Sequence, residues 1–144
     1  MQERPTFPVG VNVFVIKDGK LLLGQRKNTA GDGLWGLPGG HLETGENMID
    51  CARRELKEET SLEAEKFIFA NLANDNGPTN NRHYVQVGMI AEGIKGEVKL
   101  TEPELCYEWK WFDLHNLPKE IFFGHKNQIE LFLRGLSFGD GITG

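Results

Sequence analysis

Residues 39–62 read GGHLETGENMIDCARRELKEETSL, and this stretch determines the architecture expected around it. From Asn47 to about Thr60 there is no glycine or proline, so nothing in the sequence interrupts a helix. Ile49, Ala52 and Leu56 recur at spacings of three and four, which is the apolar stripe of an amphipathic helix. The stretch therefore predicts a glycine-containing loop that leads into a helix.

The predicted helix carries three acidic residues, Glu55, Glu58 and Glu59, within five positions. On a helix they project over about 100° of arc beside the apolar stripe. Like charges at this spacing destabilise an isolated helix by roughly 0.2–0.5 kcal/mol per pair, which favours a bound cation or compensating basic groups. Hard carboxylate oxygens select Mg²⁺ or Mn²⁺ over Zn²⁺. A solvated acidic face, paired with basic residues of the same helix, is the alternative.

The stretch resembles the box of the Nudix hydrolase family, which reads Gly, five residues, Glu, seven residues, Arg-Glu-aliphatic-x-Glu-Glu-x-Gly-aliphatic. Ser61 is the departure, because the family usually has Gly at the end of the helix, so the local cap geometry is in doubt. Eight of the nine fixed positions are in register: Gly40, Glu46, Arg54, Glu55, Leu56, Glu58, Glu59 and Leu62.

The resemblance implies an α/β fold of the α+β type, an α/β/α sandwich with a mixed central sheet and a catalytic loop-helix-loop. It implies that Glu55 and Glu59 are the principal Mg²⁺ ligands, with Glu58 nearby and the Gly39 carbonyl completing the shell. Arg54 would orient a glutamate rather than contact substrate. The metal would lower the pKa of a bound water while a carboxylate accepts its proton.

Other residues are candidates outside the acidic helix. Related enzymes differ in the general base, and Glu102 and Glu104, just before a predicted strand, are candidates on a distal loop. Arg26 resembles a family position that contacts substrate phosphate, where a guanidinium suits bidentate recognition. A surface salt bridge is the alternative for Arg26. Gly40 is assigned with Arg26 to substrate binding.

Aromatic and imidazole side chains give a weaker signal. Trp35, Tyr84 and Phe123 could stack on a base, but packing in the core or at its rim is the favoured interpretation. His41 and His83 adjoin predicted site elements, and structural roles are favoured for both.

Strand patterns flank the predicted helix on both sides. Val9–Ile16 alternates β-branched and aromatic residues, and a turn at 17–20 leads to the apolar run Leu21–Leu23, which predicts a hairpin. The segments at 65–74, 83–93 and 108–112 are also strand-like, and a closing helix is predicted from Pro118 to Leu133. A polar joining loop is predicted at 75–82 and a frayed tail at 139–144.

Length and composition favour one soluble domain over residues 1–144. The net charge of −5 argues against a basic surface for nucleic acid, so a small nucleotide is the expected partner. Cys51 and Cys106 suggest no disulfide framework or zinc site, which fits a reducing, cytoplasmic compartment. No segment resembles a signal peptide or a membrane span. Because related enzymes are often homodimers, a homodimer is expected.

The resemblance extends to GHLE, to EPE-x-C-x-x-W-x-W and to Phe-Phe-Gly near position 123, which are similar to the small enzymes that convert nucleoside triphosphates to monophosphate and pyrophosphate. We therefore expect a Mg²⁺-dependent (deoxy)nucleoside triphosphate diphosphatase. The alternative enzyme is a pyrophosphatase of ADP-ribose, a nucleotide sugar or a dinucleotide. A non-catalytic nucleotide-binding regulator on the same fold is less expected, because a pure binder need not keep the three glutamates.

Overall fold

The computed structural model describes residues 3–76 and 83–141. Its main sheet is mixed and has five strands in the order β5-β1-β7-β6-β9. β1 runs parallel to β7, and β9 parallel to β6, while the other neighbours are antiparallel. The bounds in sheet order are Gly39–His41, Val9–Phe14, Tyr84–Lys95, Glu63–Asp75 and Phe138–Gly139.

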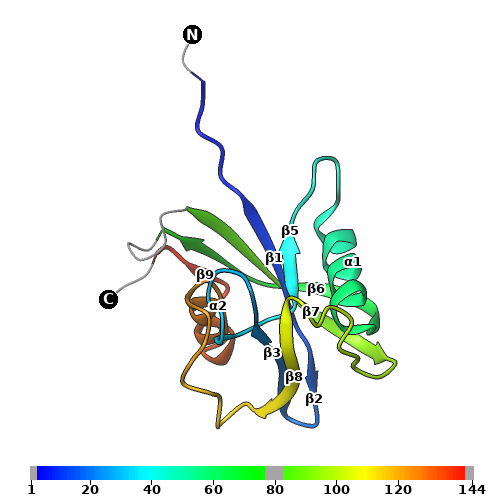
Figure 1. Ribbon diagram of the computed structural model, residues 1–144. Coiled ribbons are helices and arrows are strands. Elements are labelled where there is room, and N and C mark those ends of the chain that lie inside the picture. The colour runs from blue at the N-terminus through cyan, green and yellow to red at the C-terminus, as the bar shows by residue number, and fades with distance from the viewer. Residues whose placement is uncertain (1–2, 77–82, 142–144) are drawn as a thin grey trace.

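A second sheet has β3 at its centre and extends from the end of β1 (Figure 1). Its register is interrupted between Gly24 and Arg26, where β3 pairs with β8. Gly24 is needed there, because a Cβ atom at this position would lie 2.7 Å from the ring of Trp109. The strands are β2 (Ile16–Lys17), β3 (Lys20–Arg26), β4 (Trp35–Gly36) and β8 (Cys106–Asp113).

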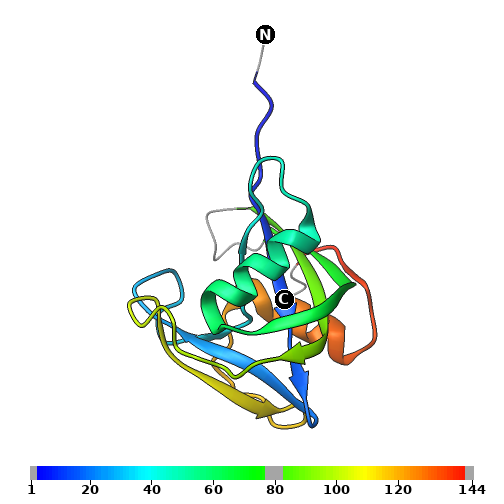
Figure 2. The same cartoon turned by 90° about the vertical axis from the view of Figure 1, so that its right-hand side faces the viewer.

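Two helices, α1 (Met48–Thr60) and α2 (Phe123–Leu133), lie on opposite sides of the strands (Figures 1 and 2). Successive residues of a strand point to opposite faces, which explains how one strand serves both helices. Val13 of β1 packs in a buried cluster with Leu56 of α1, whereas Phe14 packs in a second cluster with Ile129 of α2. The expected α/β/α sandwich with a mixed sheet is confirmed.

The predicted helix in the acidic stretch is confirmed, with Asn47 at its N-cap. Ser61 ends it in the left-handed conformation at φ 67°, and its N–H donates to the carbonyl of Lys57. Ser61 thus adopts the conformation that a glycine would adopt without strain. Ile49 was wrongly placed in the apolar stripe: it is 45% exposed, and Cys51 is buried beside Ala52 instead.

The closing helix was predicted to begin too early. It begins at Phe123 rather than near Pro118, because the preceding residues pair with β4. Trp35 N–H donates to the Glu120 carbonyl at 2.8 Å, and Phe122 N–H donates to the Trp35 carbonyl at 2.7 Å. Ile121 therefore forms an isolated bridge with Trp35 of β4, and Phe122 donates to the same residue, instead of entering the helix.

The structure describes only part of the two segments that were predicted to be irregular, 75–82 and 139–144. Asp75 closes β6, and residues 77–82 of the predicted joining loop lie outside the described part. The predicted frayed tail is wrong at its start, because Gly139 pairs with Ala73 in β9, while 142–144 are not described. Within the described ranges, no helix combines the length and the apolar character that crossing a membrane requires.

Candidate active site

Helix α1 packs beside the short strand β5 (Figure 1), and two of its glutamates, Glu55 and Glu59, lie against that strand. A Cβ atom at Gly40 would lie 2.4 Å from the carboxylate of Glu55, so only glycine lets that carboxylate press against the strand. Gly39 N–H donates to Glu59 Oε1 at 3.2 Å. The two glycines of GGHLE therefore contact the two glutamates that the family resemblance predicts to be metal ligands.

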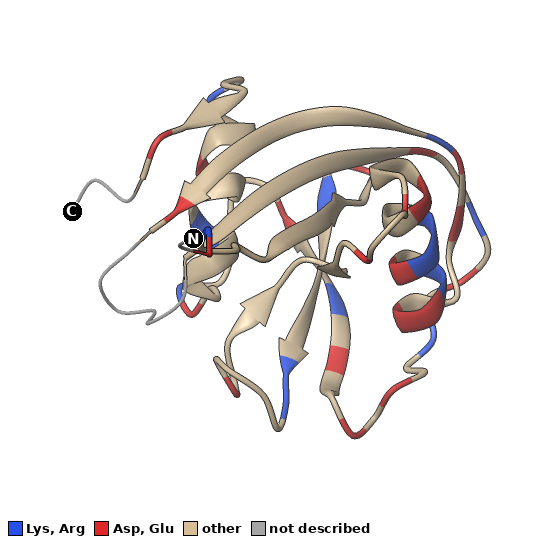
Figure 3. Cartoon of the chain, turned by 90° about the horizontal axis from the view of Figure 1, so that it is seen from above, with Lys and Arg blue, Asp and Glu red and all other residues tan. Residues whose placement is uncertain are grey.

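Arg54 is the centre of the charged network on α1, where basic and acidic residues gather (Figure 3). Its guanidinium donates to both carboxylate oxygens of Glu46, at 2.8 and 3.0 Å, and to Glu55 at 2.8 Å. The hydrogen bonds from Arg54 lower the pKa of Glu46 to about 2. A longer contact of 3.4 Å reaches Glu58. Arg54 thus holds the position of Glu55 through direct hydrogen bonding.

Burial works against the charge of Glu59. Desolvation raises its pKa well above the usual range, and the neighbouring carboxylate of Glu55 raises it further. The hydrogen bond from Gly39 N–H acts in the opposite direction. Two carboxylates this close favour either a proton or a cation between them.

The glutamates line a cavity of about 460 Å³, here called the acidic cavity. Glu102, from the segment between β7 and β8, joins Glu55, Glu58 and Glu59 in its wall. Burial raises the pKa of Glu102, and the nearby carboxylates add to the effect. Of the two distal base candidates, the structure therefore brings Glu102 to the cluster.

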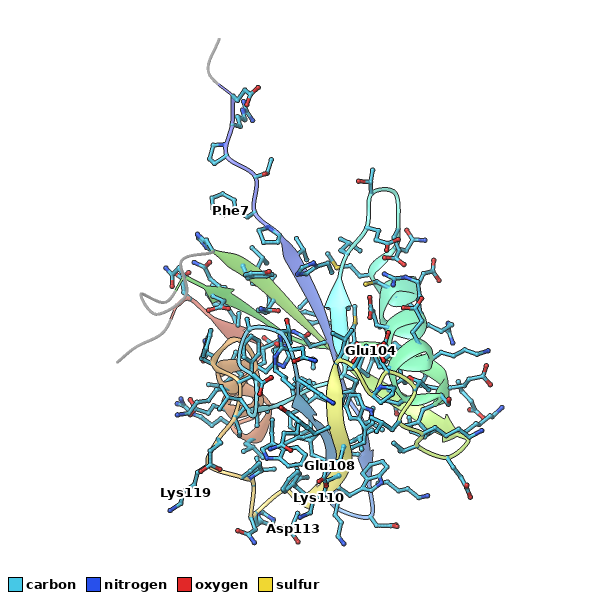
Figure 4. All side chains as sticks on the ribbon, viewed as in Figure 1. Phe7, Glu104, Glu108, Lys110, Asp113 and Lys119 are labelled. Carbon is cyan, nitrogen blue, oxygen red and sulfur yellow. The ribbon has the colours of Figure 1, made fainter. Side chains whose placement is uncertain are left out.

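Glu104 has a different environment. Its side chain is exposed just before β8 (Figure 4). Its backbone carbonyl accepts a hydrogen bond from Asn28 Nδ2 at 3.0 Å, which ties this segment to the loop after β3. The fold thus separates two acidic residues that are only two positions apart in sequence.

Glu55 and Glu59 could hold a divalent cation through carboxylate oxygens, which are the ligands that Mg²⁺ takes. Among residues 3–76 and 83–141, no three acidic, histidine or cysteine side chains converge closely enough to form a protein cage for a metal ion. Mg²⁺ is usually held by one or two carboxylates, with water and substrate phosphate completing the shell. The paired carboxylates of Glu55 and Glu59, beside the Gly39 backbone, meet that requirement.

A second cavity of about 250 Å³, here called the Gln86 cavity, adjoins the first. Arg26, Gly39, Gly40 and His41 line both cavities, so they mark the boundary. Arg26 Nε donates to the Ala30 carbonyl at 2.7 Å, and its guanidinium lies 3.9 Å from the centre of the Phe122 ring. Within the described ranges Arg26 forms no ion pair, so the surface salt bridge considered for it is absent there.

The weaker aromatic and histidine candidates divide into two groups. Tyr84, Phe123 and His41 line the Gln86 cavity, and His41 Nε2 lies 3.1 Å from the Tyr84 hydroxyl. Trp35 instead packs edge-on against Phe112, with ring centres 4.9 Å apart. His83 contacts the ring of Phe7 and the side chain of Asn74. Packing is thus the observed role of Trp35, and a structural contact that of His83.

Sequence reasoning missed a buried amide network beneath the Gln86 cavity. Asn12 Nδ2 donates to Gln86 Oε1 and to Gln128 Oε1, each at 2.8 Å. Gln86 Nε2 lies 3.5 Å from Asp75 Oδ2. The signal available was a polar residue in the middle of an apolar strand, as in VGVNVF and YVQVGM, because such residues need a partner when buried.

His125 was also missed. It lies in the first turn of α2, lines the Gln86 cavity and accepts a hydrogen bond at Nδ1 from Leu37 N–H at 3.0 Å. Its partner is 88 positions away, so no local pattern reveals the contact.

Comparison with known proteins agrees with this geometry. The NUDIX domain family matches residues 6–132. A protein of Methanocaldococcus jannaschii named ADP-ribose pyrophosphatase is 35% identical over 128 residues, which cover 88% of this chain and 73% of the relative. A Pelagibacter ubique protein named RNA pyrophosphohydrolase is 28% identical over 75% of this chain and 77% of its own. The crystal structure of a MutT NUDIX hydrolase from Burkholderia pseudomallei superposes with a TM-score of 0.82 at 28% identity, covering 88% of this chain and 98% of that one.

Proposed function

The chain belongs to the Nudix hydrolase family, and from this we propose that it hydrolyses the diphosphate linkage of a nucleotide with Mg²⁺ as its cofactor. The preferred substrate in this proposal is a nucleoside triphosphate, recognised by its base and its triphosphate together, and the products are the monophosphate and pyrophosphate. The family resemblance of the flanking segments supports this choice of substrate.

The observation that carries the proposal is the junction of the two cavities. Four carboxylates line the acidic cavity, and Arg26 and the Gly39–His41 strand separate it from a cavity lined by amide and aromatic groups. A nucleotide would fit these two cavities. Its phosphates would lie in the acidic cavity with a cation and Arg26, and its base would lie against the less charged surface of the Gln86 cavity.

In the proposed reaction Glu55, Glu59 and the Gly39 carbonyl would hold Mg²⁺. Bound there, the cation would supply Lewis-acid chemistry, polarising phosphate oxygens and making a bound water more acidic. Arg54 keeps Glu55 oriented through their 2.8 Å hydrogen bond, and Arg26 binds a phosphate at the cavity boundary. Water adds to phosphorus, the bond to the leaving phosphate oxygen breaks, and a carboxylate takes the proton of the water.

Glu102 is suited to accept that proton. Its raised pKa makes it a stronger base than an ordinary glutamate, and it lies in the wall of the acidic cavity. Glu55 and Glu58 are less suited, since each accepts a hydrogen bond from Arg54. The general base therefore comes from the segment before β8 in this proposal.

The test is phosphorus NMR of the products formed from separate substrates. Pure protein and Mg²⁺ are incubated with nucleoside triphosphates, with ADP-ribose and with a nucleotide sugar. Pyrophosphate and monophosphate from the triphosphates are the expected products. If the protein cleaves none of these substrates, the proposed reaction is wrong.

ADP-ribose is the second candidate substrate, favoured by the Methanocaldococcus jannaschii relative and its name. Cleavage of ADP-ribose gives two monophosphates and no pyrophosphate, so the same spectra distinguish the candidates. Because another relative is named RNA pyrophosphohydrolase, a 5′-triphosphorylated RNA oligonucleotide belongs in the panel. The exclusion of nucleic acid, the homodimer and the cytoplasmic location remain predictions from the sequence.

A further inference from the structure

His125 is a buried imidazole that the proposed chemistry does not use. It is 5% exposed, and it lines the Gln86 cavity from the first turn of α2. Its Nδ1 atom accepts the hydrogen bond from Leu37 N–H. A ring nitrogen that accepts carries no proton, so the ring is neutral and its proton is on Nε2. Burial, aided by the charge of Arg26, lowers the pKa of His125 to about 3, which agrees with a neutral ring.

The fixed tautomer determines what His125 can offer a ligand. Its side chain can donate a hydrogen bond from Nε2 but cannot accept one, because Leu37 occupies Nδ1. Within the described ranges, no protein group accepts from Nε2. A donor in the wall of a cavity favours a ligand atom that accepts.

The amide of Gln86 resembles His125 in that its acceptor atom is already used within the protein. Its Oε1 accepts from Asn12, which leaves Nε2 as the donor end, 3.5 Å from Asp75 Oδ2. Gly10 makes this position possible, because a Cβ atom there would lie 2.1 Å from Gln86 Oε1. Gln86 Nε2 lies close to α2, within 3.4 Å of the place where a Cβ of Gly124 would be. The donor end of Gln86 is therefore near the turn that carries His125.

The beginning of α2 adds positive potential to this wall. Phe122 is the N-cap and provides no side-chain hydrogen bond, and the first turn contains no acidic residue. The first N–H groups of a helix carry partial positive charge. The guanidinium of Arg26 lies over the Phe122 ring on the same side. The side-chain donors in this wall are thus His125 Nε2, Gln86 Nε2 and the Arg26 guanidinium, and the Asp75 carboxylate is an acceptor beside them.

We infer that His125 determines base selectivity by donating from Nε2 to a carbonyl oxygen of the bound base, so that 6-oxopurines are preferred to adenine. The inference rests on the proposed function only in taking a nucleotide as the ligand. An exocyclic amino group at the same place would face Nε2–H with a second donor, and both would lose their hydrogen bonds to water without replacement. Inosine and adenosine nucleotides test this directly, because position 6 carries a carbonyl in one and an amino group in the other.

The first measurement is calorimetric binding of IMP and AMP, which requires no turnover. We expect the wild-type protein to bind IMP about tenfold or more tightly than AMP, and to show a similar preference in kcat/KM for ITP over ATP. Selective IMP binding without hydrolysis of any substrate would sustain the inference while removing the proposed function. Equal binding of IMP and AMP would overturn the inference whether or not the protein is an enzyme.

Two variants separate recognition from packing. His125→Asn keeps an acceptor near the position of Nδ1 for Leu37 N–H but lacks Nε2, whereas His125→Gln places an amide near Nε2 and loses the Nδ1 acceptor. We expect His125→Asn to abolish the preference for IMP with little change in Tm, and His125→Gln to keep the preference with a lower Tm. Loss of the preference in both variants in proportion to their loss of Tm would assign His125 a structural role instead.

Discussion

Glu59 lies where burial and a neighbouring carboxylate both oppose its negative charge. Such a residue destabilises the metal-free protein and gains a favourable interaction when a cation arrives. The same carboxylate receives a hydrogen bond from Gly39 N–H, which holds it in position before the cation binds. Its cost to folding and its proposed use in metal binding would therefore have one physical origin.

Glu59→Gln should lower kcat/KM by about a hundredfold or more while leaving the Tm of the metal-free protein unchanged or raised. The amide keeps the side-chain size and an oxygen for Gly39 N–H, but it removes the charge that is proposed to bind Mg²⁺. Activity assays and calorimetric titration with Mg²⁺ measure both effects. Glu97→Gln, an exposed position outside the site, is the control. Near-normal turnover of Glu59→Gln would refute its role as a ligand.

Glu102→Gln in the same assays distinguishes the base from the ligands. We expect kcat to fall while the affinity for Mg²⁺ stays close to that of the wild type. A loss of Mg²⁺ affinity equal to that of Glu59→Gln would make Glu102 a ligand instead.

Gly40→Ala should reduce activity through steric displacement rather than through charge. The new Cβ would lie 2.4 Å from the Glu55 carboxylate, which must move away from β5. We expect about a tenfold or greater loss of kcat/KM with weaker Mg²⁺ binding, because small displacements of catalytic groups are costly. Gly135→Ala is the contrast: its φ of 67° predicts lower stability with activity retained. If Gly40→Ala retains full activity, the close approach of Glu55 to β5 is dispensable.

At the level of elements, the end of α1 shows how the fold accommodates a departure from the family box. Ser61 accepts a left-handed conformation that glycine adopts at less cost, and its N–H still closes the last turn on Lys57. Thr60 supports the same turn, because its hydroxyl donates to the Leu56 carbonyl at 2.6 Å. The substitution therefore affects stability while α1 keeps its glutamates in place.

Ser61→Gly should raise the free energy of unfolding by about 0.5–1 kcal/mol, since relief of the left-handed strain exceeds the added entropy of the unfolded chain. Urea denaturation measures the change, and catalytic activity should not respond. Ser61→Ala is the matched control because it retains the strain. A gain of the same size in both variants would show that the backbone conformation is not the cause.

The sequence predicted α1, most strands and the three glutamates of α1 that line the acidic cavity, because those properties depend on short-range periodicity and on one contiguous box. It did not predict where α2 begins, because the hydrogen bonds of Phe122 and Trp35 join segments far apart in the chain. The same limit hid the contact of Asn12 with Gln128, which are 116 positions apart. Their pairing depends on the order of strands, which hydrophobic periodicity does not specify.

For the molecule as a whole, His125 links acid stability to the packing of α2. Its pKa of about 3 in the folded protein lies below the ordinary 6.5, so the unfolded chain binds the extra proton between these values. Its contribution to stability is complete above pH 6.5 and is lost progressively as the pH falls toward 3. The loss approaches about 1.4 kcal/mol per pH unit within this window.

Comparison with His125→Gln isolates this effect from the other titrating groups. We expect the free energy of unfolding of the wild type to fall more steeply than that of the variant between pH 6.5 and 4.5, and the two slopes to agree above pH 7. Urea denaturation over a pH series gives both slopes. Parallel slopes across the acidic range would mean that His125 is not held neutral by the fold.

The adjoining cavities also have a consequence for how such proteins diverge. The carboxylates of the acidic cavity come mainly from one uninterrupted stretch, whereas Asn12, Gln86 and His125 come from β1, β7 and α2. If the Gln86 cavity receives the base as proposed, a lineage can change what it recognises through isolated point changes while inheriting its acidic segment intact. This separation predicts relatives that share the acidic segment but differ in substrate. The relatives named ADP-ribose pyrophosphatase and RNA pyrophosphohydrolase agree with that prediction.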